Sequence, residues 1–103
     1  MERIEKLQNM LVESPGDNFL QHALALEFIK QGRDDEAETL FTSILHADPG
    51  YTGSYYHLAR LYERQQKIPE AITVYEKGME ACKEKNEMHN LYELTAAYED
   101  LTF

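Results

Sequence analysis

Four histidines and one cysteine are the side chains of this sequence best suited to bind a metal ion or to act as a base or nucleophile. The histidines are spread along the chain, at His22, His46, His57 and His89. They form no His-x3-His pair and no HExxH motif, the spacings that place two ligands on one helical face. His89 and Glu93 fit a surface ion pair instead. Cys82 has no neighbouring histidine and no second cysteine, so we expect a small, half-buried side chain near the end of an amphipathic helix.

The sequence also lacks the short motifs that hold phosphate or build a hydrolytic site. It contains no P-loop, no GxGxxG, no GxSxG and no paired-carboxylate motif. Among the seven tyrosines, those on apolar helical stripes are Tyr55, Tyr62 and Tyr75. Those expected to be available to a ligand are Tyr51, Tyr56 and Tyr98. The sequence therefore predicts no enzyme, no cofactor and no metal site.

Length and composition restrict the class of protein further. A chain of 103 residues is long enough for one small domain, and a hydrophobic content of 43% predicts that it folds. The net charge of -9 disfavours nucleic acids and anionic membranes as partners, because both attract positive surfaces. No apolar run approaches the roughly 18 residues needed to cross a membrane. A single cysteine and the lack of an export segment favour a cytoplasmic location.

The sequence repeats itself at a spacing of 34 residues. Residues 18–51 align with residues 52–85, and the matches fall three, four and seven residues apart, the spacing of neighbours on one helical face. The identical pairs are Leu24/Leu58, Ala25/Ala59, Gln31/Gln65, Glu36/Glu70, Ala37/Ala71, Thr39/Thr73 and Ala47/Ala81, and Phe28/Tyr62 and Phe41/Tyr75 keep an aromatic ring. The alignment predicts one structural unit that occurs twice.

Each repeat contains two amphipathic segments separated by a break, which predicts a helical hairpin. In the first repeat Gly32 tolerates a left-handed turn, and Asp34 is expected to cap the second helix. Pro49 ends that helix, because proline disfavours helical geometry in the residue before it. In the second repeat Pro69 fits the first turn of a helix, where its missing N–H costs nothing.

The pattern continues for half a repeat at each end. Residues 1–17 predict the closing helix of a truncated unit, and residues 86–103 predict a capping helix with Asn86 as its N-cap. The sequence thus predicts a single domain of six helices, near residues 2–13, 17–31, 34–47, 52–66, 69–83 and 87–101.

A 34-residue helix-turn-helix unit of this kind resembles the tetratricopeptide repeat (TPR) family. The positions that carry the resemblance are Leu24, Ala25, Phe28, Gly32, Ala37, Phe41 and Pro49 in the first repeat and Tyr55, Leu58, Ala59, Tyr62, Ala71 and Tyr75 in the second. Ala25 and Ala37 let two antiparallel helices approach closely. The second repeat departs from the pattern with Gln66 in place of glycine, Gly78 in place of alanine and Lys83 in place of proline. The last departure leaves open whether the fifth helix stops there or runs on.

The resemblance implies an all-α fold in which antiparallel helix-turn-helix repeats stack in a right-handed α-solenoid. The alternative is a generic six-helix bundle whose internal similarity is accidental. Either fold is built from helices alone.

The resemblance also implies a non-catalytic scaffold or adaptor that binds a peptide or a segment of a partner protein in a concave groove. Carried over by position, the residues implied to line the groove are Phe19, His22, Leu26, Ile29, Lys30, Tyr56, Arg60, Glu63, Arg64, Asn90, Leu94 and Tyr98. Spacing supports this in the first repeat, because Phe19, His22 and Leu26 share a helical face that differs from the packing face.

Three of the ten cationic residues fall in the implied groove: Lys30, Arg60 and Arg64. We therefore expect a ligand with apolar anchors near Phe19 and an acidic or carboxylate group near Arg60 and Arg64, where guanidinium groups form bidentate pairs. The alternative is that these cations pair with local carboxylates such as Glu27 and Glu63.

Chaperone-binding members of the family, as the resemblance implies, hold a terminal carboxylate with a set of lysine and asparagine residues. His22 and Leu26 stand where a leading lysine and asparagine would be needed, so this clamp is not expected here.

A different function is self-association. Leu94, Tyr98 and Leu101 make the last predicted helix apolar on more than one side, and with the apolar residues around Ile29 they could pair two copies into a homodimer. The sequence leaves this alternative open.

Overall fold

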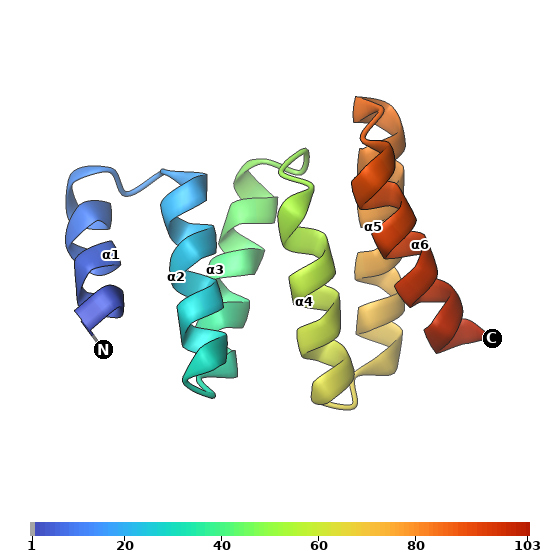
Figure 1. Cartoon of the computed structure of the whole chain (residues 1–103), viewed down its shortest axis with the longest axis horizontal. Helices are drawn as coiled ribbons and strands as arrows, with labels where there is room; N and C mark the ends of the chain where they lie inside the picture. The colour runs from blue at the N-terminus through green and yellow to red at the C-terminus, as the bar shows by residue number, and fades with distance from the viewer. Residues whose placement is uncertain (1) are drawn as a thin grey trace. The chain divides into compact units, whose positions relative to one another are not determined.

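The computed structural model describes residues 2–103, and this range consists of six α-helices joined by short turns, with no strand (Figure 1). The helices are α1 (Glu2–Glu13), α2 (Asn18–Lys30), α3 (Asp34–Ala47), α4 (Gly53–Arg64), α5 (Ile68–Lys85) and α6 (Met88–Thr102). Their bounds lie close to those predicted, and the all-helical prediction is confirmed.

Contacts between residues divide the chain into two compact units, one ending at Ala47 and the other spanning Asp48–Phe103. In the first unit α2 packs against both α1 and α3. Ala25 and Ala37 have no exposed surface, because small side chains let α2 and α3 approach closely. The core of this unit consists of Ile4, Leu7, Leu24, Ala25, Phe28, Ala37, Phe41 and Ile44.

The second unit is built from α4, α5 and α6, and α5 packs against both of the other helices. Its core consists of Tyr55, Leu58, Ala59, Leu61, Ala71, Tyr75, Ala81, Cys82, Leu94 and Ala97. Burying a large apolar side chain such as that of Leu58 or Leu94 stabilises the fold by about 1.5–3 kcal/mol. Cys82 is fully buried rather than half-buried as predicted, and burial raises the pKa of its thiol above the usual value. A neutral and inaccessible thiol is a poor nucleophile.

The turns inside the two hairpins share one backbone conformation. Gly32 has a φ of 73°, and Gln66, its equivalent 34 residues later, has a φ of 62°. In each turn the next N–H bonds back to a carbonyl near the end of the first helix. These bonds join Arg33 to Phe28 at 2.8 Å and Lys67 to Tyr62 at 2.9 Å. The second turn therefore holds a glutamine in the left-handed region that normally favours glycine.

Two predicted helix caps are wrong. Asp34 lies within the first turn of α3, where its charge adds to that of Asp35 and Glu36, instead of preceding the helix. Asn86 adopts a left-handed conformation with a φ of 56° and ends α5, whereas Glu87 directly precedes α6. The fifth helix runs on past residue 83 because no proline stands there to stop it.

Candidate interaction surfaces

The first unit carries the α2 residues that the sequence assigns to a groove. Phe19 is 70% exposed, and Leu26 and Ile29 are half-buried. His22 is half-buried too, and its ring stands edge-on to that of Phe41, with the ring centres 5.6 Å apart. Phe19 is therefore the apolar side chain that α2 offers most openly, whereas His22 also packs against α3.

Lys30 belongs to an ion-pair cluster that joins α2 to α1. Its Nζ donates to Glu27 Oε2 at 3.1 Å, and Arg3 Nε lies 3.3 Å from the same oxygen. The bond from Lys30, reinforced by Arg3, holds the pKa of Glu27 below its usual value. The side chains of Arg3 and Lys30 are 65% and 70% exposed, against 13% for Glu27. A ligand that approaches this cluster meets positive charge first.

On α4, Arg60 and Glu63 form a second ion pair. Arg60 Nη1 lies 3.7 Å from Glu63 Oε1, and the guanidinium carbon lies 6.0 Å from the ring centre of Tyr56. The other carboxylate oxygen of Glu63 accepts a hydrogen bond from the hydroxyl of Tyr75, a fully buried residue of α5. Arg60 is 51% exposed and Glu63 only 23%. Glu63 thus ties α4 to α5, and Arg60 faces outward.

The remaining predicted residues of α4 also lie outside the core. Tyr56 is half-buried with its ring edge-on to His57, at 5.6 Å between ring centres, and Arg64 is exposed. Burial lowers the pKa of His57, and the charge of Glu93 on α6 opposes that shift. His57 therefore marks where α4 and α6 come near each other.

Asn90, predicted to line the groove from α6, forms hydrogen bonds to other side chains of the second unit. Its Nδ2 donates to Thr52 Oγ1 and to Glu87 Oε2, both at 3.2 Å. The hydroxyl of Thr52, a residue only 6% exposed, also donates to Glu87 Oε2. The three side chains join the start of α4 to the start of α6.

Leu94 is only 1% exposed, so the prediction that it lines a groove or pairs two copies is wrong. It packs in the core, where its Cδ1 lies close to Gly78 of α5. Tyr98 is half-buried, and its hydroxyl donates to Glu76 Oε2 at 3.1 Å. Both side chains face α5, which shows that α6 is rotated from its predicted orientation.

The rotation arises because α6 follows α4 at a spacing of 36 residues and not 34. The burial pattern of α4 recurs in α6 at this distance, in the pairs Leu58/Leu94 and Leu61/Ala97. The extension of α5 to Lys85 and the turn after it account for the shift. On this spacing, the equivalents of Tyr56, Arg60 and Glu63 in α6 are Tyr92, Ala96 and Glu99.

Sequence reasoning therefore missed the outward face of α6. Tyr92 is 74% exposed, and Ala96 and Glu99 are exposed as well. Next to Tyr92, Glu93 Oε1 lies 3.8 Å from His89 Nε2, the surface pair that the sequence predicted. The signal was present in the sequence, because Leu91, Leu94 and Tyr98 repeat the apolar spacing of Tyr55, Leu58 and Tyr62.

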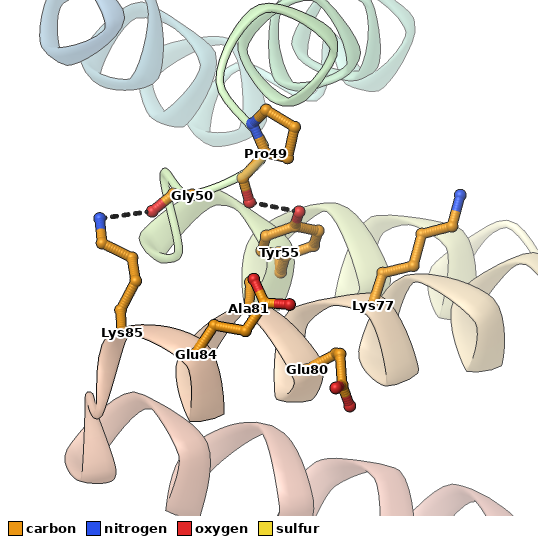
Figure 2. Close-up of a pocket in the computed structure, with 8 residues that line it drawn as sticks. All are labelled: Pro49, Gly50, Tyr55, Lys77, Glu80, Ala81, Glu84 and Lys85. Carbon is orange, nitrogen blue, oxygen red and sulfur yellow. Dashed lines mark hydrogen bonds between the residues drawn. The ribbon is translucent and has the colours of Figure 1, made fainter.

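Two hollows of the second unit are lined by residues other than those predicted for the groove. The first, of about 310 Å³, has Tyr55 at its centre with Lys77 and Lys85 extending on either side (Figure 2). Lys85 Nζ donates to the Gly50 carbonyl at 2.8 Å, and the hydroxyl of Tyr55 donates to the Pro49 carbonyl at 2.6 Å. The second hollow, of about 330 Å³, is lined by Tyr62, Pro69, Glu70, Thr73 and Val74.

Comparison with known proteins decides the family. The sequence model of a family described as tetratricopeptide repeat matches residues 28–94. A tetratricopeptide repeat domain protein from Salinibacter ruber is 37% identical in its crystal structure, which aligns over 84% of this chain and 96% of that one with a TM-score of 0.80. Its solution structure is 38% identical over 84% and 88% of the two chains, with a TM-score of 0.81. The chain belongs to the tetratricopeptide repeat family.

More distant TPR domains share the fold. The TPR2B domain of yeast Sti1, solved in complex with pHsp70, is 16% identical over 96% of this chain and 79% of that one, with a TM-score of 0.88. The first TPR of Spaghetti (RPAP3), bound to the HSP90 peptide SRMEEVD, is 19% identical over 96% and 74%, with a TM-score of 0.81. No curated protein matches the sequence. The all-α TPR-like fold is thereby confirmed.

The TPR positions quoted from the sequence have distinct environments. The buried ones are Leu24, Ala25, Phe28, Ala37, Phe41, Tyr55, Leu58, Ala59, Ala71 and Tyr75. Tyr62 is half-buried, and Gly32 and Pro49 are exposed turn residues. The first group packs the TPR hairpins, and the turn residues determine where the helices end.

Neither a metal-binding cluster nor a membrane-spanning helix occurs within residues 2–103. No three His, Cys, Asp or Glu side chains in this range gather closely enough to hold a metal ion. None of the helices in the same range combines the length and the apolar character needed to span a membrane.

Proposed function

We propose that this TPR protein is a non-catalytic scaffold or adaptor that binds segments of another protein on exposed helix faces, that of α2 in the first unit and, separately, those of α4 and α6 in the second. The observation that carries the proposal is the recurrence of exposed aromatic and charged side chains on helices whose opposite faces form the cores. Phe19 and Lys30 on α2, Arg60 on α4 and Tyr92 on α6 are each at least half exposed. Exposed aromatic and arginine side chains are the residue types that dominate protein interfaces.

The distant relatives support this class of function. Two TPR domains of the same fold were solved with an Hsp70 partner and with an HSP90 peptide. Because these domains share little sequence identity with this chain, they do not identify its partner. What they support is that a helical face of this shape can hold a protein segment.

In each ion pair the cation is more exposed than the carboxylate, and this difference indicates the chemistry of the ligand. Arg60 is more exposed than Glu63, and Lys30 is more exposed than Glu27. An acidic side chain or a terminal carboxylate can therefore approach the outer cation, near Arg60 and Arg64 on α4, without displacing the inner carboxylate. The absence of the lysine and asparagine set at His22 and Leu26 argues against the carboxylate clamp of chaperone-binding relatives.

The test is affinity capture with the full chain from an extract of its own cells, followed by titration of the captured protein. Arg60→Gln combined with Arg64→Gln is expected to weaken that binding about tenfold, because two charge-assisted contacts are lost. Neutral glutamine keeps a polar side chain beside Glu63, and circular dichroism checks that the variant remains folded.

The matched control removes two lysines of α5 instead, Lys77→Gln with Lys83→Gln, which changes the net charge equally. Both lysines are exposed and lie on a different helix. The control is expected to bind as the parent does. Equal binding by the arginine variant and the parent would show that the cations of α4 do not contact the partner.

Self-association remains the second candidate, and one observation favours it. Leu91 and Leu101 on α6 are only half-buried, so part of this apolar face is exposed to solvent. Two copies that pair through this face would bury it. Light scattering across a dilution series distinguishes the candidates, because a dimer that persists at low concentration and is lost in Leu101→Asp supports self-association, whereas a monomer supports the adaptor.

A further inference from the structure

We infer that the segment bound by the second unit is of mixed charge, with an acidic group placed over α4, a basic group placed over α6 and apolar side chains between them. The inference rests on the proposed function and specifies its partner: an extended protein segment that carries both signs of charge. Its basis is a reversal of charge between two helices that otherwise present equivalent faces.

The two helices form adjacent surfaces of one unit. Within the second unit, α4 and α6 contact each other and run in the same direction (Figure 1). Equivalent residues at a spacing of 36 therefore lie at similar heights along the two helices. The exposed residues of α6 at positions i, i+4 and i+7 are Tyr92, Ala96 and Glu99. They share one helical face, as do Tyr56, Arg60 and Glu63 on α4.

A tyrosine begins each face. Tyr56 is half-buried against His57, whereas Tyr92 is 74% exposed. An aromatic ring with that much exposed surface offers a large apolar contact that the fold does not use. The pair of rings defines the position of apolar side chains in the ligand.

Beyond the tyrosines the exposed charges of the two helices have opposite sign. They are Arg60 and Arg64 on α4, where Glu63 is half-buried, against three carboxylates on α6. Arg60 on α4 is replaced at the equivalent position of α6 by the uncharged Ala96. Residues 88–102 of α6 contain no lysine or arginine, and Glu93, Glu99 and Asp100 are all exposed. Glu93 lies 3.8 Å from His89, a partner that is charged only when protonated. The face of α6 is therefore acidic beside the exposed arginine of α4.

This arrangement discriminates between ligands. A uniformly acidic segment that binds Arg60 would bring its other carboxylates against Glu93 and Glu99. A uniformly basic segment would bring its cations against Arg60, which carries the same charge. A segment with one charge of each sign pairs with both helices, and juxtaposed like charges reject the alternatives.

The experiment selects ligands from a random ten-residue peptide library displayed on phage, with the full chain immobilised at low salt. The expected result is enrichment of peptides that contain both an acidic and a basic residue beside an aromatic or aliphatic one. Enrichment of purely acidic or purely basic peptides would leave the proposed function standing and overturn the inference. A chain that enriches no peptide overturns the proposed function and the inference with it.

Charge-reversed variants then test which helix binds the acidic group of the ligand and which binds the basic group. Glu99→Lys is expected to weaken binding of a selected mixed-charge peptide about tenfold and to shift a new selection toward acidic peptides. Glu80→Lys is the matched control, because it changes the net charge equally from an exposed position on α5. If Glu99→Lys and Glu80→Lys bind the selected peptide equally well, the assignment of the basic group to α6 is wrong. Circular dichroism confirms the fold of both variants.

Discussion

Gly78 on α5 lies so close to Tyr55 on α4 that a β-carbon at Gly78 would be 2.7 Å from Cβ and 2.9 Å from Cγ of the tyrosine. The same carbon would lie 3.0 Å from Cδ1 of Leu94 on α6. The glycine therefore stands where the three helices of the second unit meet. Alanine is the usual residue at this position of the repeat, and here it does not fit.

The first prediction follows from this contact. Gly78→Ala is expected to destabilise the protein by about 1–2 kcal/mol, because the cost of overpacking exceeds the gain in helix propensity. Urea denaturation monitored by circular dichroism measures the change. Gly53→Ala is the control, since nothing lies within 4 Å of a β-carbon added at Gly53. A Gly78→Ala protein as stable as the parent would mean that α4 and α6 can move apart at no cost.

The second prediction concerns the turn between α4 and α5. Gln66 holds a φ of 62°, which costs energy for a residue that has a β-carbon. Gln66→Gly is expected to stabilise the protein by about 0.5–1 kcal/mol, measured as a rise in the midpoint of thermal unfolding. The same change at Gln31, whose φ is -91°, relieves no strain and is expected to destabilise slightly. A loss of stability in Gln66→Gly would contradict this account of the turn.

The sequence predicted the hairpins correctly because their signals are local. Period, small residues and turn residues recur in both repeats, and the helices formed near the predicted bounds. The orientation of α6 depended on something less local, the point at which α5 ends. Without a proline at residue 83, α5 continues to Lys85, and the later start of α6 turns Leu94 inward and Tyr92 outward.

The site could be predicted only in part for a similar reason. Spacing placed Arg60 and Lys30 on outward faces, but it left open whether local carboxylates hold them. That question depends on side-chain geometry across helices, such as the bond from Tyr75 that keeps Glu63 beside Arg60. The charge of a helix face can be counted from the sequence, whereas the exposure of each partner in an ion pair requires the fold.

The third prediction concerns alkaline pH. Burial, together with the bond to Glu63, raises the pKa of Tyr75 far above its usual value of 10.0. A raised pKa contributes stability that is fully present below pH 10 and is lost as the pH rises, because unfolding then releases the proton. Tyr75→Phe is expected to cost about 1 kcal/mol at neutral pH and to weaken the loss of stability above pH 10.

Chemical denaturation at several pH values between 7 and about 11 checks this prediction. Tyr92→Phe is the matched control, because Tyr92 is 74% exposed and its removal is expected to change neither the stability nor its pH dependence. An unchanged alkaline slope in Tyr75→Phe would show that the buried hydroxyl does not control this transition.

The fourth prediction concerns acid. Thr52 and Asn90 donate to Glu87, and Lys85 Nζ lies 3.7 Å from its Oε1. The bond from Thr52, with the other donors, lowers the pKa of Glu87 below its usual value of 4.5.

A lowered pKa contributes stability that is present above pH 4.5 and disappears as the pH falls through the folded-state pKa, because the unfolded chain binds the proton first. Glu87→Gln is therefore expected to reduce stability at neutral pH and to flatten its decline below pH 4.5. Glu84→Gln, an exposed neighbour, serves as the control in acid denaturation, and an equal decline in Glu87→Gln and the parent would mean that this network does not link α4 to α6 energetically.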